Sequence, residues 1–146
     1  MPSQEYEDYL QSPEWRDKRR KWLKRSGCRC AMFPWVEVGT RGNPADTHHM
    51  HYRTFKRERF GRDVVMLCPF AHRKIIHGFL SGGRIPQQQD SFPNAAQRAV
   101  HFWCRLPRLG QWLVLGIAAI GIVDWQFNTS FLADGSQQIA ELMAIL

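Results

Sequence analysis

Several features that mark common classes of enzyme and of exported protein are missing from this chain of 146 residues. It has no Gly-rich phosphate-binding loop and no G-x-S-x-G motif, which argues against a P-loop nucleotidase and a serine hydrolase. The N-terminus, MPSQEYEDYLQ, is acidic and polar, whereas a signal peptide is positively charged and then apolar. We therefore expect a cytoplasmic protein whose four cysteines form no disulfide bonds.

The sequence also has little that is long and apolar. Residues 110–123, GQWLVLGIAAIGIV, contain no charge, but 14 residues are fewer than the ~20 that a membrane-spanning helix needs. Extending the run to Phe127 includes Asp124. We expect a buried helix or strand here. A membrane-associated segment over residues 110–127 is the alternative.

The two halves of the chain differ in charge. Residues 1–77 contain 16 lysines and arginines against nine acidic residues, an excess of seven, while residues 78–146 contain four of each. The net charge of +7 therefore belongs to the first half. A cationic surface that is segregated in this way attracts phosphate, so we expect a nucleic acid as the partner. A solvated basic face is the alternative.

The local patterns predict an α+β fold. Ser12 and Pro13 are typical of a helix start, and the basic helix should end near Gly27. Residues 28–47 contain valines and turn formers that predict a hairpin, with THHMHY on its second strand or just after it. A second helix should begin around Pro69.

Composition divides the chain into three parts. Residues 1–80 hold the basic and histidine-rich segments, and residues 81–93, rich in Gly, Pro and polar residues, are typical of a linker. Residues 94–146 should form an apolar, mainly helical extension that starts with a short helix over residues 94–104.

The most informative segment runs from Thr47 to Gly78 and contains five of the six histidines, together with many arginines and lysines. Imidazole is the commonest protein ligand for transition metals and the usual general base near pH 7. Cationic side chains attract a polyphosphate. Together these residue types indicate hydrolysis of a phosphodiester.

Residues 8–80 resemble an HNH endonuclease, a family with the ββα-metal fold. The residues that match the family pattern are the leading segment YLQSPEWRDKRRKWLKRSG, the pair His48-His49, the run DVVMLC that begins with Asp63, and His72. In the family's first motif one residue binds a divalent metal and the following His is the general base. The resemblance therefore implies a metal-dependent DNA endonuclease with a ββα-metal core, a basic N-terminal helix and a mainly helical C-terminal extension.

The same resemblance implies a role for each matching residue. His49 would take a proton from the attacking water, and one divalent ion, Mg, Mn, Ni or Zn, would be held by His48 and His72. Asp63 belongs to the catalytic motif, where it would brace the loop rather than bind metal. His77 is a further candidate ligand, although five residues correspond to ~140° around a regular helix.

A set of basic residues in the segment after the histidine pair is well placed to contact backbone phosphates, without specifying a sequence. The set consists of Arg53, Lys56, Arg57, Arg59 and Arg62. His51, by contrast, is expected to be a solvent-facing strand residue.

The resemblance breaks down at the family's structural zinc site. Two C-x-x-C pairs would hold that zinc, but the second position of each pair is Phe33 or Ala71. We expect no structural zinc, and we expect Cys30 and Cys68 to lie side by side as buried thiols. The missing cysteines keep open a second hypothesis, a nucleic-acid-binding module that does not cleave. A third hypothesis is a protein tethered to a membrane through residues 110–127. No small-molecule cofactor is expected. The oligomeric state is left open.

Overall fold

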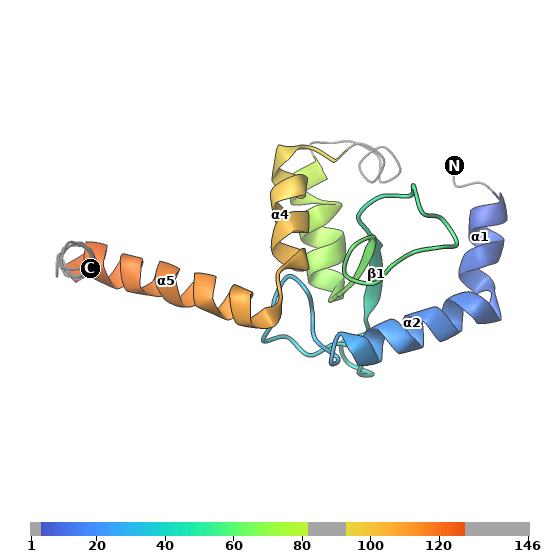
Figure 1. The fold of residues 1–146 in the computed structure, drawn as a ribbon, viewed down its shortest axis with the longest axis horizontal. Helices are drawn as coiled ribbons and strands as arrows, with labels where there is room; N and C mark the ends of the chain where they lie inside the picture. Colours follow the sequence, from blue (N-terminus) through green and yellow to red (C-terminus); the bar gives the residue numbers. More distant parts are fainter. Residues whose placement is uncertain (1–3, 82–92, 128–146) are drawn as a thin grey trace, which may run out of the picture. The chain divides into compact units, whose positions relative to one another are not determined.

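The computed structural model describes residues 4–81 and 93–127 and divides the chain into two compact units, Met1–Leu106 and Pro107–Leu146. The first unit begins with two helices, α1 (Gln4–Gln11) and α2 (Pro13–Arg25). It is a mixed structure of helices and one small two-stranded sheet within the described residues, which agrees with the predicted α+β class (Figure 1).

Helix α2 begins where the sequence predicts. The side chain of Ser12 accepts a hydrogen bond from the backbone N–H of Trp15 at 3.1 Å, and Pro13 is the first residue of the helix. Trp15 and Trp22 are buried and lie edge to face, with ring centroids 5.4 Å apart. The helix therefore turns an aromatic side toward the core and keeps its basic side chains exposed, except for the half-buried Lys18.

The sheet pairs different segments from those predicted. Strand β1 (Asp46–His49) is antiparallel to β2 (Val64–Leu67), from Asp46 opposite Leu67 to His49 opposite Val64. The histidine pair does lie on a strand, but its partner follows a loop of residues 50–63. The pairing has a physical reason, since all four side chains of β2 are buried and apolar.

The segment that was expected to form the first strand of the hairpin makes a tight loop instead. The backbone N–H of Cys30 donates to the carbonyl of Val36, and that of Val38 to the carbonyl of Cys28, both at 2.9 Å. Cys30 and Cys68 do lie side by side, as predicted, because the N–H of Cys68 donates to the Cys30 sulfur at 3.3 Å.

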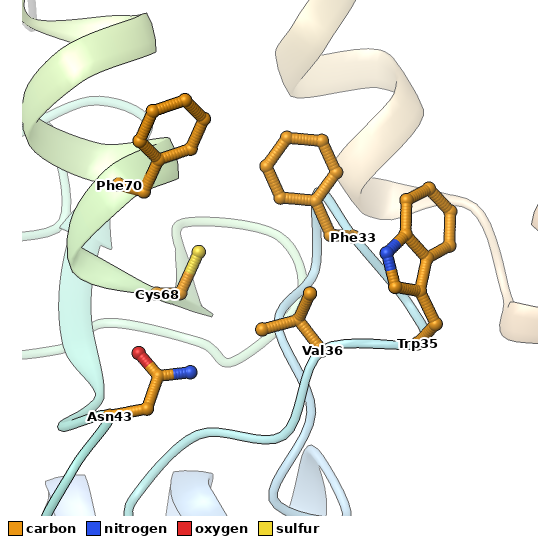
Figure 2. A pocket seen from close by; sticks show the side chains of 6 residues that line it. All are labelled: Phe33, Trp35, Val36, Asn43, Cys68 and Phe70. Carbon is orange, nitrogen blue, oxygen red and sulfur yellow. The ribbon is translucent and has the colours of Figure 1, made fainter.

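The positions of the two absent zinc cysteines are occupied differently. Ala71 is fully buried, whereas Phe33 lines a cavity of about 380 Å³ together with Cys68 and Phe70 (Figure 2). The rings of Phe33 and Phe70 are 6.4 Å apart. Apolar side chains therefore pack where the resemblance would have a metal, and burial raises the pKa of the Cys30 thiol.

Helix η1 (Phe70–Ile76) follows β2 and begins next to Pro69, as predicted. Its hydrogen bonds differ from those of a regular helix, because the N–H of His77 donates to the carbonyl of His72, five residues earlier, at 3.1 Å. This wide, π-type turn is rare and is often found at functional sites. A short helix, η2 (Phe79–Ser81), comes next.

Helix α4 (Ala95–Arg105) belongs to the first unit, whereas the sequence analysis placed it in the C-terminal extension. The side chains of Gln97 and Trp103 donate to backbone carbonyls of η1 and of the loop after α2, at 3.3 and 2.8 Å. In Figure 1, α4 runs alongside η1. The boundary of the first unit is therefore Leu106 and not residue 80, because one side of α4 is buried in the core. Residues 82–92 of the predicted linker lie outside the described residues.

The second unit contains helix α5 (Arg108–Phe127), 20 residues long. The uncharged run was predicted as a buried helix or strand. It is helical but not buried, because large apolar side chains of the helix such as Leu109, Ile117 and Trp125 are exposed. Among the described residues this is the one helix whose length and composition would allow it to cross a membrane, over Arg108–Gln126. Residues 128–146 of the predicted extension lie outside the described residues.

Candidate metal centre

Three histidines converge in the first unit, one from β1, one from the first half of η1 and one directly after η1. His48, His72 and His77 each offer one ring nitrogen, and these three atoms lie within 4.8 Å of one another. The wide turn of η1 makes this possible, since it brings two side chains that are five residues apart onto one side. The Nε2 atoms of His72 and His77 are 3.1 Å apart.

Two of the three imidazoles have the spacing of ligands to one divalent cation. Two nitrogens that are about 2.1 Å from a shared ion lie roughly 3.0–3.4 Å apart at bond angles of about 90–110°, and the His72–His77 separation falls in that range. His48 is buried, and its Nδ1 has no hydrogen-bond partner in the described part of the chain. An orphaned buried nitrogen of this kind is what a cation would satisfy.

The electrostatic setting keeps two of these residues, His48 and His72, neutral, as metal binding requires. Burial lowers the pKa of His48 well below its usual value, and the nearby imidazoles of His101 and His72 lower it further. Burial also lowers the pKa of His72, although its contact with Asp46 opposes that shift. Both side chains are therefore available as ligands at neutral pH.

Asp46 orients His72. Burial favours the neutral form of the Asp46 carboxyl, but hydrogen bonds from Arg73 and His72 outweigh it and lower the pKa of Asp46. An ionised carboxylate only accepts hydrogen bonds, so the Nδ1 of His72, 3.1 Å from Asp46 Oδ2, must carry the proton. The lone pair of His72 is then on Nε2, the atom that faces His77.

His49 lies beside the three histidines and lines the same cavity. The cavity has a volume of about 390 Å³ and is lined by Tyr6, Thr47, His48, His49, Tyr52, His72, Arg73 and His77. The His49 ring is held between Trp15, at 5.5 Å and nearly parallel, and Tyr52, at 4.9 Å. Burial lowers the pKa of His49 to about 4, although the carboxylate of Glu58 opposes the shift.

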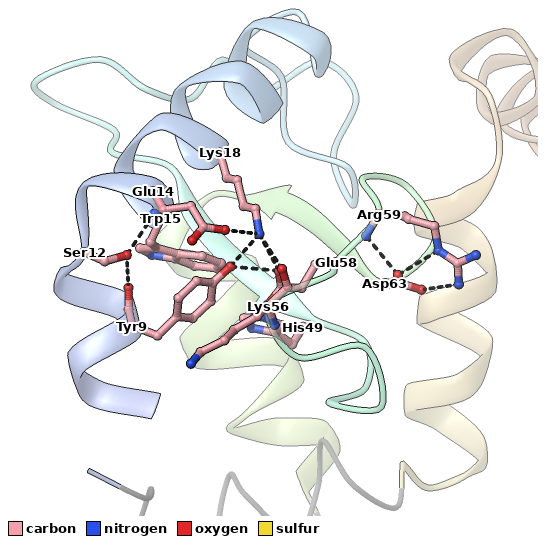
Figure 3. Close-up of polar contacts among 10 residues, drawn as sticks. All are labelled: Tyr9, Ser12, Glu14, Trp15, Lys18, His49, Lys56, Glu58, Arg59 and Asp63. Atoms are coloured by element: carbon pink, nitrogen blue, oxygen red, sulfur yellow. Dashed lines mark hydrogen bonds and ion pairs between the residues drawn. The ribbon is translucent and has the colours of Figure 1, made fainter. Parts of the chain in front are cut away.

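Glu58 is the carboxylate behind His49. Its Oε1 is 3.8 Å from the His49 Nε2, which is too long for a hydrogen bond but close enough for electrostatic attraction. Tyr9 Oη donates to Glu58 Oε2, and the Lys56 N–H donates to Oε1, both at 2.9 Å (Figure 3). These bonds hold the carboxylate in place, and with Lys18 they lower its pKa against the effect of burial.

Asp63 is fully buried but does not line the cavity. It accepts hydrogen bonds from the backbone N–H and the Nε of Arg59, at 2.8 and 3.1 Å (Figure 3). Its Oδ1 is 3.3 Å from the Nε2 of His51, which is partly buried and not the solvent-facing strand residue that was expected. Asp63 therefore ties together the two ends of the loop between the strands.

The predicted phosphate-contacting residues are all exposed and lie on that loop, outside the cavity. Two of them already have partners, since Lys56 pairs with Glu5 at 2.9 Å and Arg59 pairs with Asp63. The remaining three are Arg53, Arg57 and Arg62.

Sequence reasoning missed Asp46, Glu58 and His101. Asp46 is two residues before His48 and so shares its side of β1, a pattern that could have identified it. Glu58 is the one carboxylate within the basic stretch of residues 53–62, and His101 is the one histidine outside residues 47–78. These positions in the sequence do not indicate that Glu58 contacts His49 or that His101 contacts His48.

Comparisons with models of known protein families, with curated proteins and with solved protein structures find nothing that matches this chain. The function has to be inferred from the cavity residues and their contacts.

Proposed function

We propose that this protein is a metal-dependent endonuclease that hydrolyses phosphodiester bonds of DNA. The observation that carries the proposal is the convergence of three imidazoles beside a fourth, His49, at a single cavity. The order strand, strand, helix of β1, β2 and η1 supports a ββα-metal core, the arrangement that the resemblance to HNH endonucleases implies.

His49 is the proposed general base. Its pKa of about 4 leaves the imidazole neutral at pH 7, and a neutral imidazole can accept a proton from the water that attacks phosphorus. The Glu58 carboxylate attracts the imidazolium as it forms, so the charge that His49 acquires is partly offset within the protein. The stacked rings of Trp15 and Tyr52 fix the orientation of the His49 imidazole.

His48, His72 and His77 are the proposed ligands of one divalent ion. Bound there, the ion would offset negative charge on the scissile phosphate and on the leaving oxygen. Imidazole ligands suit Zn or Ni, and water and phosphate oxygens can complete a site for Mn or Mg. Arg73 lines the same cavity with an exposed side chain and is a candidate contact for the phosphate.

Cleavage of supercoiled plasmid tests the proposal. Wild type, His49→Ala and His51→Ala are compared in EDTA and with Mg, Mn, Ni or Zn added. His51 is a matched control, because it is a histidine two residues further on that does not line the cavity. We expect metal-dependent nicking that the His49 variant loses by about 10²-fold or more and that a folded His51 variant retains. Cleavage that persists in the His49 variant would contradict the assigned base.

A second candidate is a module that binds nucleic acid without cleaving it. The burial of His49 favours it, since only 4% of the side chain is exposed and a pKa of about 4 makes a weak base. Wild type that binds the plasmid but leaves it intact in every metal would support this candidate against the nuclease.

A further inference from the structure

Helix α4 contributes a histidine to the edge of the metal centre. His101 is buried, and its Nε2 lies 3.0 Å from the Nε2 of His48. The two ring centroids are 5.1 Å apart. His101 is 53 residues away from His48 in the sequence and is not one of the three histidines whose nitrogens converge.

The contact restricts the protonation of His48. In a hydrogen bond between two neutral imidazoles, one Nε2 carries the proton and the other accepts it. If His101 were the donor, the proton of His48 would be on Nδ1, a buried atom with no partner among the described residues, and no lone pair would be left for a cation. If His48 is the donor, its Nδ1 keeps a free lone pair.

We propose that His101 is a positioning residue of the metal centre, which accepts a hydrogen bond from the Nε2–H of His48 and so keeps the Nδ1 lone pair of His48 available to a divalent cation. The inference rests on the proposed metal site. His101 would support His48 in the same way that Asp46 supports His72. Asp46 accepts a hydrogen bond from the Nδ1–H of His72, with 3.1 Å between Nδ1 and Oδ2. Groups that hold the second nitrogen of a ligating histidine fix its tautomer and its orientation.

The packing of α4 fixes His101 in this position. One turn before it, Gln97 donates to the carbonyl of Ile76 at 3.3 Å and forms a capping box with Asn94. Two residues after it, Trp103 donates to the carbonyl of Met32 at 2.8 Å. The helix is therefore attached on both sides of the histidine, and a ring in such a setting can hold its partner with little loss of entropy.

Metal binding by the full chain tests this role. Co²⁺, Ni²⁺ and Zn²⁺ are each titrated into wild type, His101→Ala, His101→Gln and Cys104→Ala, and the visible spectrum of Co²⁺ is recorded. Cys104 is a matched control, because it is buried on α4 one turn away and is not part of the histidine cluster. We expect His101→Ala to weaken binding by roughly 10- to 100-fold, with an unchanged Co²⁺ spectrum. The Gln variant should recover most of the affinity through its accepting oxygen, and Cys104→Ala should bind as wild type.

Other outcomes have distinct meanings. Unchanged affinity in a folded His101→Ala variant overturns the proposal and makes His101 a core residue only. A Co²⁺ spectrum that changes with the substitution also overturns it, because His101 would then be a ligand itself. Wild type that binds none of the three ions overturns the metal centre as a whole, a failure that the wild-type titration alone reveals.

A measurement on wild type avoids any variant that fails to fold. The ¹⁵N chemical shifts of the imidazole nitrogens in the metal-free full chain report which nitrogen carries the proton. We expect His48 protonated at Nε2 and unprotonated at Nδ1. Protonation at Nδ1 overturns the proposal.

Discussion

Two buried carboxylates illustrate how neighbours determine the role of a residue. Asp63 was expected in the catalytic motif as a brace, and its contacts with Arg59 and His51 join the two ends of the loop. Glu58 was not singled out by the sequence, yet it is the carboxylate next to His49. Both are ionised because hydrogen bonds outweigh the effect of burial on the pKa.

Glu58→Gln tests the support that this carboxylate gives to the proposed base. The substitution keeps the shape of the side chain but removes the charge that attracts a protonated His49. We expect plasmid cleavage to fall by about 10- to 100-fold, less than the loss of the base itself causes. Glu14→Gln is the control, because Glu14 is an exposed carboxylate that pairs with the same Lys18 at 2.9 Å. Equal activity of the two variants would remove Glu58 from the mechanism.

Asp63→Asn should destabilise the first unit in a pH-dependent way. The folded chain lowers the pKa of Asp63, so the folded state binds a proton less tightly than the unfolded chain does. The stabilisation is complete above the unfolded pKa of about 4 and is lost as pH falls through the lower folded value. We expect the free energy of unfolding to fall by about 1–3 kcal/mol at pH 7.

Urea unfolding at pH 7 and at about pH 3 measures the effect, and the difference between wild type and variant should narrow at the lower pH. Asp17→Asn, an exposed partner of Arg20 on α2, should change the stability by less than about 0.5 kcal/mol. If the difference in the free energy of unfolding between wild type and Asp63→Asn became larger at low pH, it would contradict the assignment of Asp63 as ionised in the folded state.

At the scale of elements, the wide turn of η1 decides the composition of the metal centre. A regular helix would place His77 about 140° from His72, whereas the five-residue hydrogen bond brings their Nε2 atoms to 3.1 Å. The role of His77 as a ligand stays a prediction. In the structure His77 lies beside His72, although the five-residue spacing in the sequence argued against this position.

The loop between β1 and β2 divides the predicted phosphate contacts into two kinds. Arg57 and Arg62 are exposed, whereas Arg59 is bound to Asp63. Replacing Arg57 and Arg62 together by Ala should weaken DNA binding alike for all sequences and reduce the slope of log K against log salt by about 0.9 per lost contact. Arg59→Ala should instead lower the free energy of unfolding, because it leaves the buried Asp63 without its main partner.

Filter binding at several salt concentrations with two unrelated duplexes measures the first effect, and thermal unfolding measures the second. Arg98→Ala is a control for the removal of an exposed positive charge, since Arg98 lies on α4 and outside the loop. A loss confined to one duplex sequence would contradict the assignment to the phosphate backbone.

At the scale of the whole molecule, the first unit depends on a helix that the sequence assigned to the extension. A chain ending at Leu106 should unfold cooperatively, because α4 keeps its bonds to Met32 and Ile76. A chain ending at Ser81 should lose cooperative unfolding, since the buried side of α4 is removed from the core. Circular dichroism on heating distinguishes the two, and equal melting curves would contradict the prediction.

The same truncation tests the membrane alternative. Helix α5 is long and apolar enough to cross a bilayer. If it anchors the protein, the full chain should float with phospholipid vesicles in a density gradient, while the chain ending at Leu106 should not. Flotation of neither chain would leave α5 without this role.

Local features of this protein could be predicted from the sequence alone. Ser12 and Pro13 start α2, and the pair His48-His49 lies on a strand. The helix that begins next to Pro69 was likewise predicted, as was the side-by-side arrangement of Cys30 and Cys68. These features depend on neighbouring residues or on a recognisable spacing, and such information is present in a single sequence.

Contacts between residues that are distant in the sequence depend on how the elements pack in three dimensions. Glu58 reaches His49 because the loop folds back under Tyr9, and His101 reaches His48 because α4 packs on the first unit. The partner of β1 depends in the same way on the burial of β2. Such contacts are selected by the packing of the whole core, and composition or periodicity along the chain carries no record of that packing.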